Sequence, residues 1–320
     1  MTMRRLTIAF TLLAIAFPAG GGAQERERER ERELEHRDRV RDQEQEARLD
    51  TTIAFGKGGI VDLTLISGNI IVRQWARPEV QIRASLERGR ILSDLSSSRV
   101  SLSVRSTRGR AGEGRYELQV PVGTRVVARG TSADILVTGV QAAVEARSTS
   151  GDVVVDGATD RVTIRSISGD ITGRALIGDV QASAVSGDVE LDQVTGEISS
   201  STVSGDITLT RIVSKDVRIE TVSGEVQYDG SIDRTGRYEF HTHSGNVAFG
   251  IPDGTGASLS LETFSGEIES DFPITIQPTA LAGSRNRNAR RLDTTLSGGG
   301  ARIIAETFSG NITIERVTRK

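Results

Sequence analysis

The 320-residue chain contains no cysteine, which excludes disulfides, thiol catalysis and covalent haem attachment. Lipid attachment to a cysteine after an export signal is excluded for the same reason. Aromatic residues make up only 4% of the chain, with a single Trp, and there are only 6 prolines. A fold built from this sequence must therefore depend on an aliphatic core.

Glycine, in contrast, is abundant at 35 residues, and Val, Ile, Thr and Ser recur throughout the second half. This mixture favours strands joined by tight turns over helices. The formal net charge of −3 gives no reason to expect nucleic acid or an anionic membrane as a partner.

Residues 1–23 have the features of a secretory signal peptide. Arg4 and Arg5 precede an apolar run over residues 6–17, and small residues at 21–23 offer a cleavage site. An uncleaved N-terminal anchor is the alternative interpretation. No later segment reaches transmembrane length, so we expect a periplasmic, secreted or cell-surface protein with no transmembrane segment after cleavage.

Residues 24–50 form a charged, low-complexity segment that begins with alternating Glu and Arg. It contains too few apolar residues to bury a core, and we interpret it as a solvated linker. Docking of this segment to a charged envelope polymer is the functional alternative.

From Thr51 to about Arg129 the chain predicts consecutive strands. Apolar and polar residues alternate over 60–66, 80–84, 100–104 and 116–120, as they do in half-buried strands.

The second half of the chain repeats a turn made of Ser, Gly and an acid or amide, followed by Val or Ile. Its first intervals are 18, 18 and 18 residues, then 19, 21 and 21, with a final gap of 44. A fixed period of this size is typical of a solenoid. The Gly and acid or amide positions are Gly151-Asp152, Gly169-Asp170, Gly187-Asp188, Gly205-Asp206, Gly224-Glu225, Gly245-Asn246, Gly266-Glu267 and Gly310-Asn311.

Matched apolar columns accompany these turns, before each Ser and after each acid or amide. The sequence therefore predicts an all-β fold, a parallel β-helix or β-solenoid over residues 51–320, with coils of about 18–22 residues. An antiparallel sandwich is the competing fold, but it has no reason to keep equally spaced identical turns. We expect an irregular loop at about 278–300, after which the repeat resumes and closes the chain.

The repeated turn has a structural explanation and a functional alternative. Gly supplies positive φ, and Asp or Asn can accept a hydrogen bond from its own following backbone. A calcium ladder is the alternative, because Asp152, Asp170, Asp188 and Asp206 would stack along one edge. The Gly-Gly-x-Gly-x-Asp pattern of calcium-binding toxin repeats is absent.

No catalytic set is visible, and we predict neither an enzyme nor a cofactor. The serines lie in turns without a Gly-x-Ser-x-Gly elbow, and no pair of carboxylates is marked as a glycosidase pair. His241 and His243 would point to the same side of a strand and could share a metal. His243 lies in an apolar column, which favours a partly buried structural histidine.

One succession of segments resembles a known bacterial group. It runs through residues 116–121 (Tyr-Glu-Leu-Gln-Val-Pro) and 126–128 (Val-Val-Ala) into repeated Ser-Gly-Asp-Val/Ile. Over residues 51–320 the chain resembles the family of unknown function labelled putative adhesin, and is similar to the head domains of putative autotransporter adhesins. The resemblance implies a β-helix in a cell-envelope setting and carries over no catalytic residues.

The leading hypothesis is an exported, non-catalytic envelope protein whose rigid surface serves adhesion, binding or scaffolding. Its partner would be an envelope or surface ligand, either protein or polysaccharide, contacted by the sheet faces and the loop at 284–291. A carbohydrate-active β-helix enzyme, lyase or hydrolase, is the first alternative. A self-assembling structural protein is the second, because solenoid ends expose unpaired strand edges.

Overall fold

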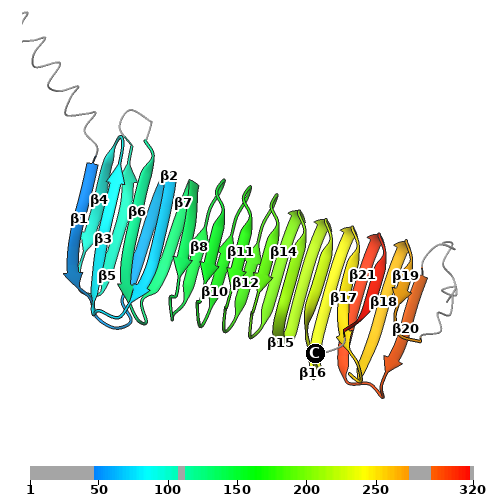
Figure 1. Cartoon of the computed structure of the whole chain (residues 1–320). Coiled ribbons are helices and arrows are strands. Elements are labelled where there is room, and N and C mark those ends of the chain that lie inside the picture. The colour runs from blue at the N-terminus through cyan, green and yellow to red at the C-terminus, as the bar shows by residue number, and fades with distance from the viewer. Residues whose placement is uncertain (1–46, 107–111, 274–289, 318–320) are drawn as a thin grey trace, which may run out of the picture. The chain divides into compact units, whose positions relative to one another are not determined.

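In the computed structural model, residues 47–106, 112–273 and 290–317 are described, and all regular elements among them are β-strands (Figure 1). The chain divides into two units, Met1–Gln45 and Glu46–Lys320, and all described residues belong to the second. The predicted signal peptide and most of the predicted linker lie outside the described residues. Among the described residues there is no helix with the length and hydrophobicity needed to cross a bilayer.

The regular middle of the stack contains short strands at a constant spacing. They are β8 (Val144–Arg147), β9 (Val153–Asp156), β10 (Val162–Arg165), β11 (Ile171–Arg174), β12 (Val180–Ser183), β13 (Val189–Asp192) and β14 (Ile198–Ser204). Val144 pairs with Val162 and Val162 with Val180, all in parallel, so each residue lies beside the one 18 positions further on. The structure confirms the predicted parallel β-solenoid.

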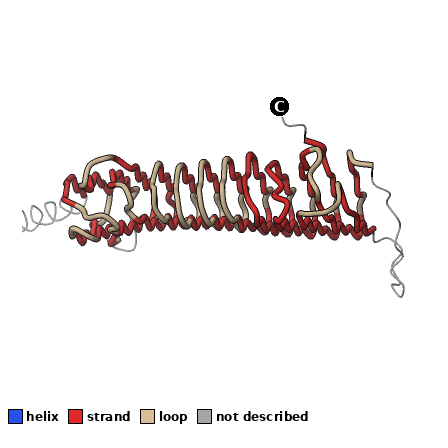
Figure 2. Tube along the Cα trace, turned by 90° about the horizontal axis from the view of Figure 1, so that it is seen from below, coloured by secondary structure: helices blue, strands red, loops and turns tan. Residues whose placement is uncertain are grey.

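Each coil contributes one strand to each of two sheet faces. The first face contains β8, β10, β12 and β14, and the second contains β9, β11 and β13. Two longer strands, β15 (Ile207–Ser223) and β16 (Val226–Ser244), continue both faces without a break between them. Viewed from below, the two faces form separate layers that are joined coil by coil (Figure 2).

The core lies between the two faces and follows the alternation of strand side chains. In β10, Val162 and Ile164 are buried while Arg165 is exposed. Each buried Val, Ile or Leu stabilises the stack by roughly 1.5–3 kcal/mol. In the longer coils aromatic residues replace aliphatic ones: Phe240 and Phe249 are buried, with ring centroids 5.5 Å apart.

The C-terminal end departs from the order of the sequence. Its strands are β17 (Val247–Pro252), β18 (Ala257–Ser265), β19 (Ile268–Ser270), β20 (Arg290–Leu296), β21 (Ala301–Ser309) and β22 (Ile312–Val317). Ile303 of β21 pairs with Tyr238 of β16 on one side and with Leu259 of β18 on the other. The last coil of the sequence is therefore inserted between two earlier coils and does not lie at the end of the stack.

The predicted loop at 278–300 is only partly described. Residues 290–296 form β20, which pairs antiparallel with β18 at the edge of the first face, and residues 278–289 lie outside the described residues. An antiparallel strand can occupy this position because the chain returns along β18 before it enters the last coil.

The N-terminal end has a related arrangement. Its strands are β1 (Ala47–Ala54), β2 (Ile60–Trp75), β3 (Glu79–Leu86), β4 (Arg90–Leu95), β5 (Arg99–Arg105), β6 (Gly114–Pro121) and β7 (Arg125–Thr138). Strand β2 lies between β7 on one side and β5 and β6 on the other, all parallel to it. Antiparallel pairs, β1 with β3 and β4 with β5, complete this end. Residues 47–50, which the sequence assigns to the linker, belong to β1 because Leu49 packs against the core.

Candidate functional site

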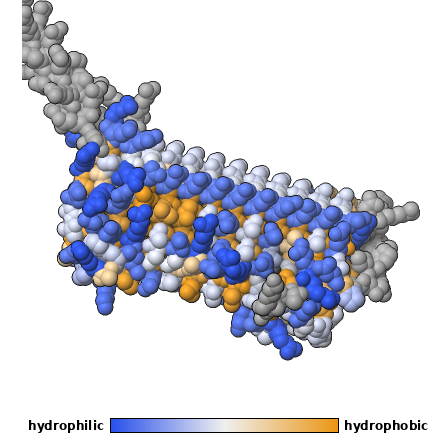
Figure 3. All heavy atoms as spheres, in the orientation of Figure 1, coloured by the Kyte–Doolittle hydropathy of each residue, from blue (hydrophilic) through white to orange (hydrophobic). Residues whose placement is uncertain are grey.

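The repeated Ser-Gly-acid turns stack along one edge of the solenoid, where the first face passes into the second. Figure 3 shows an unbroken row of hydrophilic residues along the upper edge of the strands. Each Asp of the regular coils accepts a hydrogen bond from the backbone N–H of the acid in the next coil, whereas Glu225 accepts one from the side-chain Nδ2 of Asn246 at 2.8 Å. Asp188 N donates to Asp170 Oδ1 at 2.9 Å, and Asp206 N donates to Asp188 Oδ1 at 2.8 Å.

The same ladder continues through the irregular end of the stack. Asn311 N donates to Asn246 Oδ1 at 3.0 Å, and Glu267 N donates to Asn311 Oδ1 at 2.9 Å. The expectation that each acid bonds its own following backbone was wrong, because the side chain reaches across to the neighbouring coil. Asn can replace Asp in this ladder since both supply the same acceptor oxygen.

The glycine of each turn is required by close packing between coils. A Cβ on Gly187 would lie 2.3 Å from the carbonyl oxygen of Gly169, and one on Gly205 would lie 2.2 Å from that of Gly187. Neither Gly187 nor Gly205 has positive φ. The sequence-based explanation by positive φ was therefore wrong here, and the close approach of stacked backbones replaces it.

A column of buried hydroxyls forms further hydrogen bonds between coils on the inner side of the same edge. Ser166 Oγ donates to the Gly151 carbonyl at 3.4 Å, and Thr202 Oγ1 donates to the Gly187 carbonyl at 3.2 Å. Side chain and backbone of the repeated turn are thus used in contacts between coils. Within the described residues, no group of three or more His, Asp or Glu side chains is arranged to hold a metal ion.

The apolar column that precedes each Ser faces solvent rather than the core. Ile167, Val185, Val203 and Val222 are 43–49% exposed, and Phe308 in the same column is 47% exposed. The interpretation of this column as core was wrong. The alternation of β10 contains the signal that was missed: Val162 and Ile164 point inward, so Ile167 must point outward.

The two histidines lie on this outer surface. Nδ1 of His241 lies 3.2 Å from a carboxylate oxygen of Glu306 on the neighbouring strand β21. His243 is exposed, and its ring stacks on Phe308 with centroids 5.0 Å apart, while Phe308 stacks on Phe264 at 4.6 Å. The expected partial burial of His243 was wrong, and the three rings instead form a surface stack.

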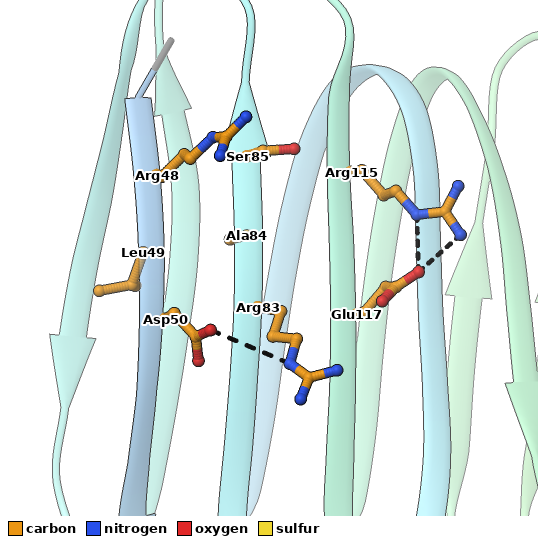
Figure 4. Close-up of a pocket in the computed structure, with 8 residues that line it drawn as sticks. All are labelled: Arg48, Leu49, Asp50, Arg83, Ala84, Ser85, Arg115 and Glu117. Atoms are coloured by element: carbon orange, nitrogen blue, oxygen red, sulfur yellow. Dashed lines mark hydrogen bonds and ion pairs between the residues drawn. The ribbon is translucent and has the colours of Figure 1, made fainter.

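A shallow hollow of about 250 Å³ lies on the outer side of β1, β3 and β6 (Figure 4). Charged side chains surround it, and they pair with one another, Arg83 with Asp50 across two strands and Arg115 with Glu117 within β6. Arg83 Nε lies 4.0 Å from Asp50 Oδ2, and Arg115 Nε donates to Glu117 Oε1 at 2.6 Å. The hollow is open, and its paired charges resemble the rest of the outer face.

The groups with shifted pKa values do not line this hollow. Burial raises the pKa of Tyr116 to about 12, and burial also raises the pKa of Tyr228 and of Tyr238, all inside the stack. Burial of Glu239 tends to raise the pKa of its carboxyl, but hydrogen bonds from Arg237 and Arg218 outweigh that effect and lower it. These shifts belong to structural residues of the core and of one sheet face.

The loop proposed as a contact feature, 284–291, is described only at its last two residues. Arg290 Nη1 lies 3.1 Å from Glu267 Oε1, and Arg291 Nε lies 2.8 Å from Asp293 Oδ2. Both arginines are therefore tied to the end of the stack.

Comparison with known proteins gives a family and a set of solved folds. The family described as Toastrack DUF4097 matches residues 143–315, and no curated protein matches the chain. A putative adhesin from Bacteroides fragilis is 10% identical, with a TM-score of 0.42 over 83% of this chain and 96% of its own. A putative lipid binding protein from Parabacteroides distasonis is 11% identical, with a TM-score of 0.39 over 85% and 97%. A putative adhesin from the same organism is 9% identical, with a TM-score of 0.37 over 84% and 97%.

Proposed function

The chain belongs to the Toastrack DUF4097 family, and from that premise we propose that it is an exported, non-catalytic protein of the cell envelope. Its solenoid would present a rigid surface for binding or scaffolding. The partner would be an envelope or surface ligand, either protein or polysaccharide, recognised along a sheet face.

The observation that carries this proposal is how the repeated polar residues are used. The Asp and Gly of the turns and the buried hydroxyls beside them all make contacts between coils. A repeat whose polar groups make contacts between coils forms a straight, stiff surface. A catalytic site would instead require convergent polar groups with perturbed pKa values in a pocket.

The predicted signal peptide at 1–23 and the charged segment that follows support export. The absence of cysteine is compatible with an oxidising compartment, because no thiol can be oxidised there. In this proposal the charged segment separates the solenoid from the N-terminal end of the chain.

Protease accessibility on intact cells tests the location. Cells carrying the tagged chain are treated with protease before and after the outer envelope is opened, with a known periplasmic protein as the control. Cleavage on intact cells would support surface display and adhesion, and protection until opening would support scaffolding in the periplasm. Retention in the cytoplasm would contradict export.

A polysaccharide screen tests the absence of catalysis. The purified chain is incubated with envelope and plant polysaccharides, and reducing ends and unsaturated ends are measured. We expect no release above that of a heat-denatured sample. Release that depends on folded protein would contradict the non-catalytic assignment and favour a β-helix lyase or hydrolase.

A further inference from the structure

An apolar stripe with one residue per coil runs along the outer edge of the first face. In spatial order it consists of Ile167, Val185, Val203, Val222, His243, Phe308 and Phe264. Seven coils at a strand spacing of about 4.8 Å give the stripe a length of about 30 Å. Contiguous exposed apolar residues of this kind, bordered by polar ones, are typical of an interaction site.

The column of side chains beside the stripe changes sign along the stack. Arg129, Arg147 and Arg165 lie side by side at the N-terminal half. Ser183 and Ser201 follow in the middle, and their hydroxyls are 3.2 Å apart.

At the C-terminal half the same column is acidic apart from one histidine. Glu220 is followed by His241, Glu306 and Glu262. On its other side the stripe is bordered by the small, exposed serines of the turns, which leave room for a flat partner to approach.

We propose that the stripe is the interface between two copies of this chain that lie antiparallel, related by a two-fold axis between Val185 and Val203. In this arrangement Val185 meets Val203 of the second copy, and Ile167 meets Val222. Arg165 then faces Glu220, and by symmetry the reverse pair forms as well.

Charge complementarity is the reason that a second copy fits better than another apolar partner. Reversing the direction of one copy brings its basic half against the acidic half of the other, with the two serines at the centre. A parallel pair, related by an axis along the stack, would instead place the charged column of each copy against the turn serines of the other, so no opposite charges would meet. The surface is thus complementary to itself in one direction only.

The local ion pairs show where charge is left for a partner. Arg129 pairs with Asp62 at 2.7 Å, Arg147 pairs with Glu145 at 3.1 Å, and Glu306 contacts His241. Among the described residues, Arg165 and Glu220 belong to no ion pair. These two positions therefore contribute most to selecting the antiparallel direction.

The strand edges at the ends of the stack fit this role less well. Strand β20 carries Arg290, Arg291 and Asp293 along seven residues, and charged edge strands are a common protection against pairing. The inference therefore places self-association on the side of the stack and goes beyond the proposed function, which requires only an exposed surface.

The oligomeric state of the full chain, purified after expression with its own export segment, tests the proposal. Light scattering coupled to size exclusion and sedimentation velocity should give a dimer whose dissociation constant rises with salt. Val203→Lys places two like charges beside the axis and should yield a monomer. Val213→Lys is the matched control, because Val213 is 54% exposed outside the stripe, and it should leave the dimer intact.

A charge-exchange experiment tests the direction. Arg165→Glu and Glu220→Arg should each raise the dissociation constant about tenfold, because each substitution occurs twice in a symmetric interface. A mixture of the two variants should form heterodimers as tight as the original, since both cross-pairs then join opposite charges. A variant that fails to fold could not be rescued in this way.

Three results would overturn the proposal: a chain that stays monomeric at every concentration reached, a dimer that survives Val203→Lys, or variants whose mixture shows no rescue. A chain that stays monomeric and binds lipid vesicles or a glycan through the stripe would also overturn it.

Discussion

Replacing Asp188 by Asn or by Ala separates the two effects of this carboxylate in the ladder. Its Oδ1 accepts the N–H of Asp206 at 2.8 Å, while its own N–H donates to Asp170. Asn keeps the acceptor and removes the charge, whereas Ala removes both.

The magnitudes follow from the stacking geometry. Neighbouring carboxylates about 4.8 Å apart repel by about 0.9 kcal/mol in water, and salt reduces this repulsion. Asp188 has such a neighbour on each side, so Asp188→Asn should raise the free energy of unfolding by up to about 1.7 kcal/mol at low salt. Asp188→Ala removes the same repulsion but leaves the N–H of Asp206 to water, so its free energy of unfolding should lie about 1 kcal/mol below that of Asp188→Asn.

Urea denaturation followed by circular dichroism measures both variants, at low salt and again at high salt. At low salt we expect the midpoint of the Asn variant to lie above those of the original and of the Ala variant. As salt rises, the Asn gain should shrink and the Ala variant should fall below the original. Equal destabilisation by both substitutions would refute the reasoning, because it would mean that the charge itself stabilises the edge, as a bound cation would require.

Three further predictions concern the core, the turns and metal. Gly187→Ala should lower the free energy of unfolding by roughly 2–4 kcal/mol, since its Cβ would lie 2.3 Å from a backbone carbonyl oxygen. Gly56→Ala is the control: its Cβ would have its nearest contact at 3.4 Å, so it should lower the unfolding free energy by about 1 kcal/mol or less. Similar losses in the two variants would contradict the close-packing argument. The Tyr116 hydroxyl is buried and has no hydrogen-bond partner among the described residues, so Tyr116→Phe should raise the unfolding free energy by about 1 kcal/mol. The pKa of Tyr116 is raised from 10.0 in the unfolded chain to about 12 in the folded one. The part of the unfolding free energy that depends on this ionisation is therefore fully present below pH 10 and is lost between pH 10 and 12. An alkaline transition that is unchanged in Tyr116→Phe would contradict this. Finally, the melting temperature should be the same with a chelator and with added calcium, and a calcium-dependent rise would favour a metal ladder.

The regular half of the fold could be predicted because its information is local. Equal spacing of the turns fixes the coil, and alternation around Val162 and Ile164 fixes which side chains are buried. The same alternation, carried three residues further, would have placed Ile167 on the surface. The reason for the turn glycines was inaccessible, because contact between Gly187 and Gly169 depends on how closely the coils stack.

The order of the coils at the C-terminal end could not be predicted. The turn at Gly310-Asn311 carries the same motif as every other turn, so it fits equally well at several levels of the stack. Ile303 pairs with Tyr238 and Leu259, and nothing in the spacing distinguishes these neighbours from others. The role of the exposed surface could not be predicted either, since no sequence motif in this chain indicates ligand binding.

The inserted last coil has a consequence for how the protein reaches its final state. A simple solenoid can fold by adding coils in the order in which they emerge. Here β18 and β19 are joined to the rest of the stack only through β21 and β22, which come from the end of the chain, while β20 pairs with β18 at the outer edge. The strands from β18 to β22 would therefore assemble in one late step governed by long-range contacts, which are slow to form.

Lengthening the protein is constrained in the same way. New 18-residue repeats can be inserted in the middle, between β8 and β14, without disturbing either end. A repeat appended after residue 317 would meet an already occupied position inside the stack. Solenoids of this kind are therefore expected to differ in length by repeats gained or lost at the centre, while the two terminal modules stay the same.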